Sequence, residues 1–133
     1  MEHAQSFSEL VVYQKAQILA KSIFEITKTF PKEEMYSLTD QIRRSSRSIG
    51  AQIAEAWGKR RYEKHFISKL SDADAEQLET QHWIIIAQDC EYLTREQFET
   101  LNQNLSEIGR MLYSMMSKAN QFCSATTDYY LLK

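Results

Sequence analysis

The fold is decided most clearly by residues 94–123, which read TREQFETLNQNLSEIGRMLYSMMSKANQFC. Apolar side chains recur in this stretch at steps of 3, 4, 3, 4, 3, 4 and 3 residues, at Phe98, Leu101, Leu105, Ile108, Leu112, Met115, Ala119 and Phe122. That spacing places them on one face of a helix, as in the seam of a helical bundle. Thr94-x-x-Gln97 fits a capping box, so the helix is predicted to begin just after Thr94.

Two earlier stretches show the same helical period. The first opens at Ser6, where Ser6-x-x-Glu9 fits another capping box, and Pro31 is expected to end it because the residue before a proline avoids the helical conformation. The second covers about residues 38–57, and Gly58 is expected to supply the left-handed stop that ends many helices.

A third helical stretch covers about residues 62–90 and carries two apolar lines. One line contains Phe66, Leu70, Ala73, Ile84 and Ala87, and the neighbouring line contains Ile67, Leu78 and Ile85. Two lines predict two buried faces, one more than a four-helix monomer needs. We therefore expect part of the bundle surface to be covered by further copies of the chain.

Glycine and proline are scarce, with three glycines and one proline in 133 residues. All-β folds and folds with glycine-rich nucleotide-binding loops need many more of them, so an all-α protein is predicted. The short connections favour an up-down-up-down antiparallel four-helix bundle over residues 1–123, followed by an irregular tail over 124–133. No apolar run is long enough for a membrane span and no secretion signal is evident, so a cytoplasmic location is expected.

Charge is segregated along the chain, although the net charge is only −2. Residues 42–64 carry a net +5 and residues 65–107 a net −7. A basic block with interleaved aromatic residues is typical of a surface that contacts nucleic-acid phosphates and bases. The candidate nucleic-acid-binding residues are Arg43, Arg47, Lys59, Arg60, Arg61 and Lys64, with Trp57, Tyr62, His65 and Phe66 among them. In the structural alternative, Arg43, Arg44 and Arg47 pair with the acidic third helix.

A polar stripe runs beside the apolar face of the second helix, formed by Arg44, Ser48, Gln52 and Glu55 at steps of 4, 4 and 3. Glu79 and its neighbours on the third helix are possible partners for this stripe. The pattern favours a structural polar network or a subunit contact over a functional site.

No catalytic or metal-binding set stands out. Glu79-x-x-His82 has the spacing of a di-iron carboxylate helix, but a second copy of that motif is missing from the sequence. Cys90 and Cys123 have no histidine at an activating spacing, and the glycines form no phosphate-binding loop. We therefore predict no enzymatic activity, no catalytic residues, no metal and no cofactor.

Several motifs together resemble the four-helix-bundle proteins encoded in intervening sequences of 23S ribosomal RNA genes. The motifs are Phe7-x-x-Leu10-x-Val12-Tyr13-x-Lys15-Ala16, Phe30-Pro31-Lys32-x-Glu34, Leu38-Thr39-x-Gln41-x-Arg43-Arg44, Ser48-Ile49-x-x-Gln52-Ile53-Ala54-Glu55 and Glu79-Thr80-Gln81. The resemblance implies a bundle that assembles as a ring-like homopentamer and binds nucleic acid. A related branch comprises accessory proteins of diversity-generating retroelements, in which the resemblance implies association with a reverse transcriptase.

The leading hypothesis is a non-enzymatic homo-oligomer, with pentamer as the expected size, that binds RNA or a ribonucleoprotein through the basic block. The competing hypothesis is a protein-interaction scaffold in which the same basic side chains only neutralise the acidic third helix of a neighbouring copy. Neither hypothesis involves a membrane or a small-molecule substrate.

Overall fold

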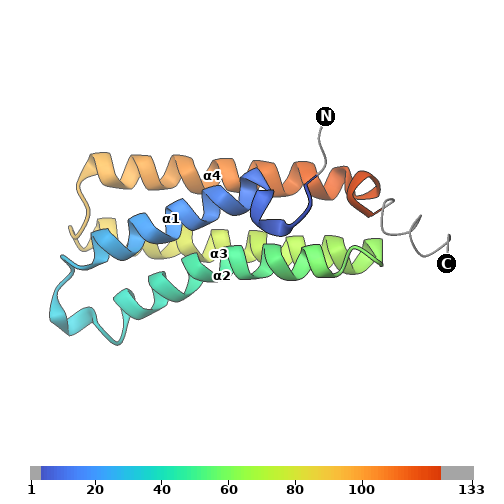
Figure 1. Cartoon of the computed structure of the whole chain (residues 1–133). Coiled ribbons are helices and arrows are strands. Elements are labelled where there is room, and N and C mark those ends of the chain that lie inside the picture. Colours follow the sequence, from blue (N-terminus) through green and yellow to red (C-terminus); the bar gives the residue numbers. More distant parts are fainter. Residues whose placement is uncertain (1–3, 124–133) are drawn as a thin grey trace, which may run out of the picture.

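Four long helices account for most of residues 4–123, the part of the chain that the computed structural model describes (Figure 1). Helix α1 spans Val11–Thr27, α2 spans Leu38–Gly58, α3 spans Glu63–Asp89 and α4 spans Arg95–Ser117. Two short 3-10 turns, η1 over Phe7–Glu9 and η2 over Lys32–Glu34, precede α1 and α2. Every regular element in this range is helical, which confirms the all-α prediction. The tail predicted over 124–133 lies outside the described residues.

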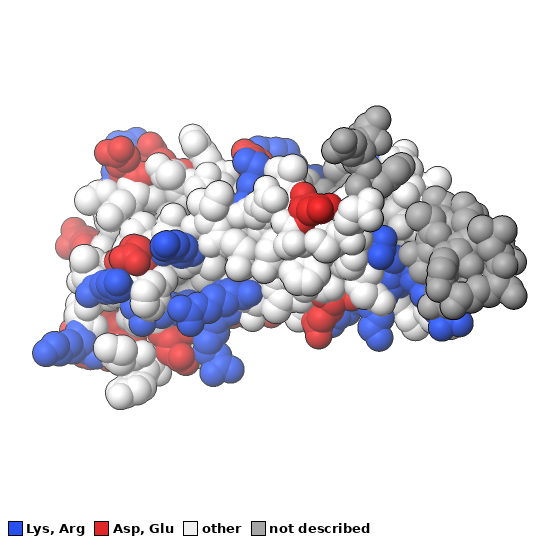
Figure 2. All heavy atoms as spheres, in the orientation of Figure 1, with Lys and Arg blue, Asp and Glu red and all other residues white. Residues whose placement is uncertain are grey.

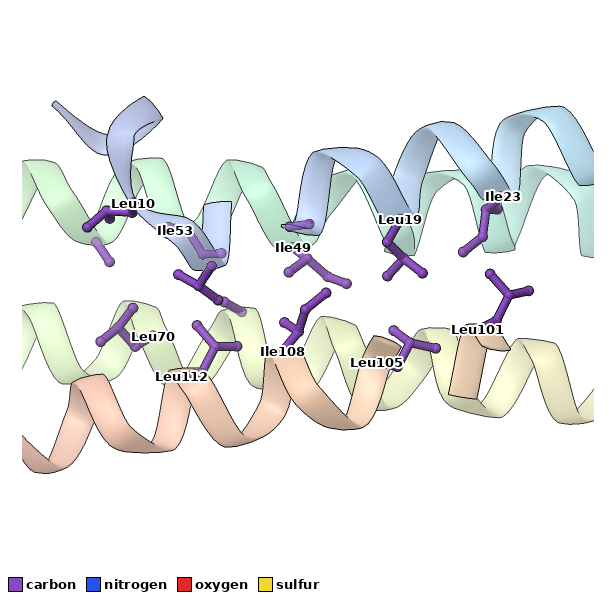
Figure 3. Packing of buried hydrophobic residues seen from close by; sticks show 14 of the residues in the cluster. Leu10, Leu19, Ile23, Ile49, Ile53, Leu70, Leu101, Leu105, Ile108 and Leu112 are labelled. Carbon is purple, nitrogen blue, oxygen red and sulfur yellow. The ribbon is translucent and has the colours of Figure 1, made fainter. Parts of the chain in front are cut away.

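The core lies between the helices. Helix α2 packs against α1 and α3, and α4 packs against α3 and α1, so each helix has two neighbours. Figure 3 shows apolar side chains from all sides meeting along the axis, among them Leu19, Ile49, Leu70 and Ile108. The seam predicted for α4 is confirmed from Leu101 to Met115, where all five apolar positions are buried. Within residues 4–123, none of the helices has the length and apolar character needed to cross a membrane.

The N-terminus of α1 corrects one prediction. The Ser6 side chain makes no capping hydrogen bond, and its hydroxyl lies 2.8 Å from that of Ser8. The Glu9 carboxylate accepts a hydrogen bond from the backbone N–H of Gln5 instead. Leu10 is extended, with φ −67° and ψ 130°, and its side chain is buried in the core. Burial of this leucine interrupts the helix, so α1 begins at Val11 rather than at Ser6.

At the other helix ends one prediction is confirmed and two are wrong. Helix α1 ends at Thr27, four residues before Pro31, so the proline does not itself end it. The capping box of α4 is present, with Gln97 N donating to Thr94 Oγ1 at 3.0 Å and Thr94 N donating to Gln97 Oε1 at 2.9 Å. Gly58, however, lies inside α2 and has no positive φ, because the chain leaves this helix through Lys59 at φ −100°. Among residues 4–123, the residue with a left-handed conformation is Glu91, after α3, at φ 62°.

Helix α3 buries only one of its two predicted apolar lines against the rest of the chain. Its inner line is buried, with Leu70 and Ile84 both at 0% exposure. On the outer line Leu78 and Ile85 keep 54% and 47% of their surface exposed. Helix α1 carries a similar exposed pair, Val11 and Ile18, seven residues apart.

Candidate nucleic-acid interface

The basic residues of α2 and the following turn fall into two groups rather than one block. Arg43, Arg44 and Arg47 lie in the first half of α2, and the second group begins at Lys59, twelve residues after Arg47. At 1.5 Å per helical residue, the two groups are roughly 18 Å apart along the axis. Figure 2 shows cationic atoms gathered at mid-length on the α2 side and again toward the end where α2 meets α3.

Arg43 connects α2 to the end of α1. Its Nε donates to Thr27 Oγ1 at 2.8 Å and its Nη2 to the Phe24 carbonyl at 3.5 Å. The carbonyls of the last helical turn have no partner inside the helix, so a cation at this position is favourable. Arg43 is half-buried, and part of its hydrogen-bonding capacity is used inside the fold.

Three cations surround the ring of Phe24, and we call these four residues the Phe24 cluster. The Arg43 guanidinium lies 4.7 Å from the ring centroid, that of Arg47 5.3 Å, and the ammonium of Lys28 4.8 Å. Each distance is within the range of a cation–π interaction. Lys28 also pairs with Glu25 at 3.1 Å, an exposed contact.

The acidic third helix does not neutralise these arginines within the chain. In residues 4–123, the ion pairs within 4 Å include none formed by Arg43, Arg44 or Arg47. On α3, Asp72 pairs with Lys69 at 3.6 Å, whereas Glu79 accepts the Trp83 indole N–H at 3.1 Å. The intramolecular pairing considered from the sequence is therefore wrong, whereas pairing between copies stays a prediction.

The second group also contains an arginine that is used inside the fold. Arg60 donates its Nε to the Trp57 carbonyl at 2.9 Å and lies 3.5 Å from the centroid of the Trp57 ring. Burial lowers the pKa of Arg60 from its usual value. Arg61 lies over the Tyr62 ring at 5.6 Å. Lys59 and Lys64 are exposed.

Two of the four interleaved aromatic residues are not available for stacking on bases. Arg60 lies over Trp57, and Phe66 is a core residue whose ring stacks on Phe122 at 5.7 Å. Tyr62 and His65 remain exposed, with their ring centroids 5.3 Å apart.

The polar stripe of α2 forms no network of its own. Ser48 donates to the carbonyl of Arg44 at 2.8 Å, and Glu55 pairs with Lys69 of α3 at 3.2 Å. The Gln52 Oε1 atom is buried without a partner among the described residues. Glu79, its suggested partner, bonds along its own helix, so a role of the stripe in a subunit contact stays a prediction.

Besides the ion pair between Glu55 and Lys69, a buried polar contact joins α2 to α3 through Ser45 and Thr80. The Thr80 hydroxyl donates to Ser45 Oγ at 2.8 Å, and both side chains are buried. The only signal in the sequence was a small hydroxyl residue at an apolar position of the helical period. Nearby on α3, burial and the charges of Glu79 and Asp72 raise the pKa of Glu76.

Sites for a metal or a small ligand are not evident in residues 4–123. No three His, Cys, Asp or Glu side chains in this range come close enough to hold a metal ion. A hollow of about 420 Å³ lies between α1 and α4 beside Ser22, Ile26 and Gln97, and an adjoining one of about 460 Å³ lies beside Ile18 and Lys21. Their linings contain no histidine or cysteine, although Lys21 and Ser22 both line the second hollow.

Comparison with known proteins gives a family but no activity. A family model described as 23S rRNA-intervening sequence protein matches residues 8–114. A crystal structure of a Bacteroides thetaiotaomicron protein of the S23 ribosomal protein family, itself of unknown function, is 36% identical. It covers 80% of this chain and 96% of its own, with a TM-score of 0.73. No curated protein matches.

Proposed function

The chain belongs to the 23S rRNA-intervening sequence protein family, and from that premise we propose that it is a non-enzymatic, homo-oligomeric RNA-binding protein. Its helices form an up-down-up-down antiparallel bundle, and several copies assemble into a ring, with a pentamer as the expected size. The bound partner is RNA or a ribonucleoprotein, and no small-molecule substrate is involved.

The observation that carries the RNA-binding proposal is the exposed positive charge on α2 and the turn after it. Arg44, Arg47, Lys59 and Lys64 are all exposed and take part in none of the ion pairs among the described residues. Unpaired exposed cations release counterions from a nucleic-acid backbone when they contact its phosphates. Arg43 and Arg60 support this surface from inside, because their guanidinium groups hold α1 and Trp57 in place.

The assembly proposal rests on the exposed apolar lines of α1 and α3. Ile18 of α1 is 65% exposed and Leu78 of α3 is 54% exposed. These helices are each flanked by α2 and α4, so their outer faces point in different directions. Contact between two different faces of identical chains is heterologous, and such contacts close into rings when the rotation permits.

RNA binding is tested by fluorescence anisotropy with a labelled single-stranded RNA at increasing salt. We expect affinity to fall steeply with salt, and to fall strongly when Arg44, Arg47, Lys59 and Lys64 are all replaced by alanine. The matched control replaces Arg95 and Arg110, two exposed cations of α4. Equal affinity in the α2 variant and this control would contradict the proposed binding surface.

Assembly is tested by light scattering on the purified chain. A multiple of the 15.6 kDa chain mass is expected. Ile18→Asp and Leu78→Asp should each give monomers, because each places a charge on an apolar contact. A monomeric wild-type protein would refute the assembly. An oligomer without RNA affinity would instead favour the protein-interaction scaffold, in which the basic side chains face the acidic side chains of α3 in a neighbouring copy.

A further inference from the structure

In the Phe24 cluster the fold gathers three positive charges that the sequence does not show to be close together. Lys28 comes from the end of α1 and Arg43 and Arg47 from α2, so helix packing brings together cations up to 19 positions apart. We propose that this cluster binds the backbone phosphates of RNA without reading its bases. This inference rests on the proposed function and assigns it a site.

The three charges are close enough to act on one another. Each lies about 5 Å from the same ring centroid, so no two are further apart than about 10 Å, the screening length at 0.1 M salt. Like charges at this distance repel, and the attraction of a phenyl ring for a cation is modest at an exposed site. A bound anion between them would remove that repulsion.

Acidic residues of the protein compensate little of this charge. Glu25 pairs with Lys28 at 3.1 Å, but this pair is about half exposed and contributes little. Asp40 lies one turn before Arg43 and Arg44 on α2, and it forms no ion pair with either. Arg44, one residue after Arg43, adds a further exposed cation to the same stretch of α2. The cluster therefore keeps an excess of positive charge.

The shape of the site favours an extended polyanion over a small one. The cluster lies along the outer edge where α1 meets α2, whereas both hollows described above lie on the α1 and α4 side. Three cations within about 10 Å of one another can contact neighbouring phosphates of one strand, and guanidinium forks match phosphate oxygens. Because cations already surround the Phe24 ring, a base has little access to its faces, and contact is limited to the backbone.

The experiment measures binding of labelled oligouridylate and oligoadenylate, each of about 20 nucleotides, between about 50 and 200 mM salt. The variant is Lys28→Ala with Arg47→Ala, since both side chains are exposed and the polar contact that is lost, between Lys28 and Glu25, is itself exposed. Arg43 is left intact because it holds α1 to α2. For each lost contact, the slope of log affinity against log salt should fall by about 0.7.

At about 0.1 M salt that change corresponds to a roughly 10- to 30-fold loss of affinity for two contacts, equal for both RNAs. The charge-conserving variant Lys28→Arg with Arg47→Lys should keep most of the affinity. Arg95→Ala with Arg110→Ala, which removes two exposed cations of α4, is the matched control. Lys59→Ala with Lys64→Ala reports on the other basic group, and circular dichroism checks that every variant is folded. A loss confined to one of the two RNAs would contradict backbone recognition.

The remaining outcomes separate this inference from the proposed function. If wild type binds RNA, and affinity falls in the Lys59 and Lys64 variant but not in the Lys28 and Arg47 variant, the inference is wrong and the proposed function stands. If wild type binds no RNA, both the proposed function and the inference are wrong. Poly-glutamate that competes as well as RNA of equal charge would show that the cluster accepts an acidic protein surface, which also refutes the inference.

Discussion

The two faces of α3 carry the same kinds of apolar side chain but differ in their surroundings. Leu70 on the inner face is fully buried by α2 and α4, whereas Leu78 on the outer face is 54% exposed. The helical period identifies both lines equally well. The difference shows that periodicity tells which residues share a face, but not whether the same chain covers that face.

The largest expected effect on stability comes from replacing leucine by alanine on the inner face of α3, compared with the same replacement on its outer face. Leu70→Ala should lower the free energy of unfolding by about 2 to 5 kcal/mol, because it leaves a cavity in the core. Leu78→Ala in dilute protein should change it by about 0.5 kcal/mol or less, because the side chain already meets water. Urea unfolding followed by circular dichroism measures both values.

Protein concentration sharpens this comparison. If the outer line is a subunit contact, the cost of Leu78→Ala should rise with protein concentration, because assembly stabilises the folded chain. The cost of Leu70→Ala should stay nearly constant. A large cost for Leu78→Ala that does not depend on concentration would mean that Leu78 is buried within the single chain.

A second pair of variants tests how tightly the inner face of α3 packs on α4. A Cβ at Gly109 would lie 2.8 Å from Gln77 Nε2, and the buried Gln77 is bonded to Asp74 and Gln81. Gly109→Ala should therefore destabilise by about 1 to 2 kcal/mol, even after the helix propensity gained from alanine. Gly58→Ala, with nothing within 4 Å, should stabilise by up to about 1 kcal/mol.

In thermal unfolding, the melting temperature should fall for Gly109→Ala and rise for Gly58→Ala if the contact at Gly109 is as close as described. Destabilisation by both would mean that the end of α2 at Gly58 needs a glycine for a reason other than space. Stabilisation by both would mean that Gln77 moves aside without losing its hydrogen bonds.

Local patterns predicted the parts of the fold that depend on neighbours in the sequence. The α4 seam and the Thr94 capping box are confirmed, because both depend on residues three and four apart. The same box pattern at Ser6 was wrong, because burial of Leu10 in the core breaks the helix there. That burial depends on helices distant in the sequence, so a local motif does not show it.

For the candidate interface, the sequence predicted which segment is basic, but not how its side chains are arranged in space. Sequence indicated the basic segment, but it did not distinguish Arg43, which bonds to Thr27, from the exposed Arg44 beside it. Lys28 was missed because it lies on another helix and approaches the arginines only through Phe24. Both distinctions depend on how α1 packs against α2.

The turn that ends α3 offers a smaller effect than the core of that helix. Glu91 adopts φ 62°, a conformation that costs an L-residue about 1 to 2 kcal/mol and costs glycine little. Because glycine loses more entropy on folding, Glu91→Gly should stabilise by only about 0.5 to 1 kcal/mol. Thermal unfolding measures the gain, with Glu99→Gly inside α4 as a destabilising control. A loss of stability in Glu91→Gly would show that the turn does not keep this conformation.

The smallest expected effect comes from a partly buried polar contact just after α3. The Tyr92 hydroxyl donates to the Glu34 carboxylate at 2.9 Å, which joins the turn after α3 to the connection between α1 and α2. Hydrogen bonds from Ser37 and Tyr92 lower the pKa of Glu34 below its usual 4.5, and Glu34 raises the pKa of Tyr92 to about 12. Tyr92→Phe keeps the ring beside Phe30 and removes only the donor.

Since the pKa of Glu34 is lower in the folded chain, its bonds contribute stability above the unfolded pKa, and that contribution is lost as the pH falls through the folded value. Tyr92→Phe should therefore be slightly less stable than wild type at neutral pH, and the difference should disappear once the pH is well below 4.5. Urea unfolding across this range measures it, with the 95% exposed Tyr36→Phe as a control that shows no such trend. A difference that persists in acid would mean that the hydroxyl acts independently of the Glu34 charge. The contribution of the Tyr92 hydroxyl to stability would then be independent of pH, like that of the apolar inner line of α3.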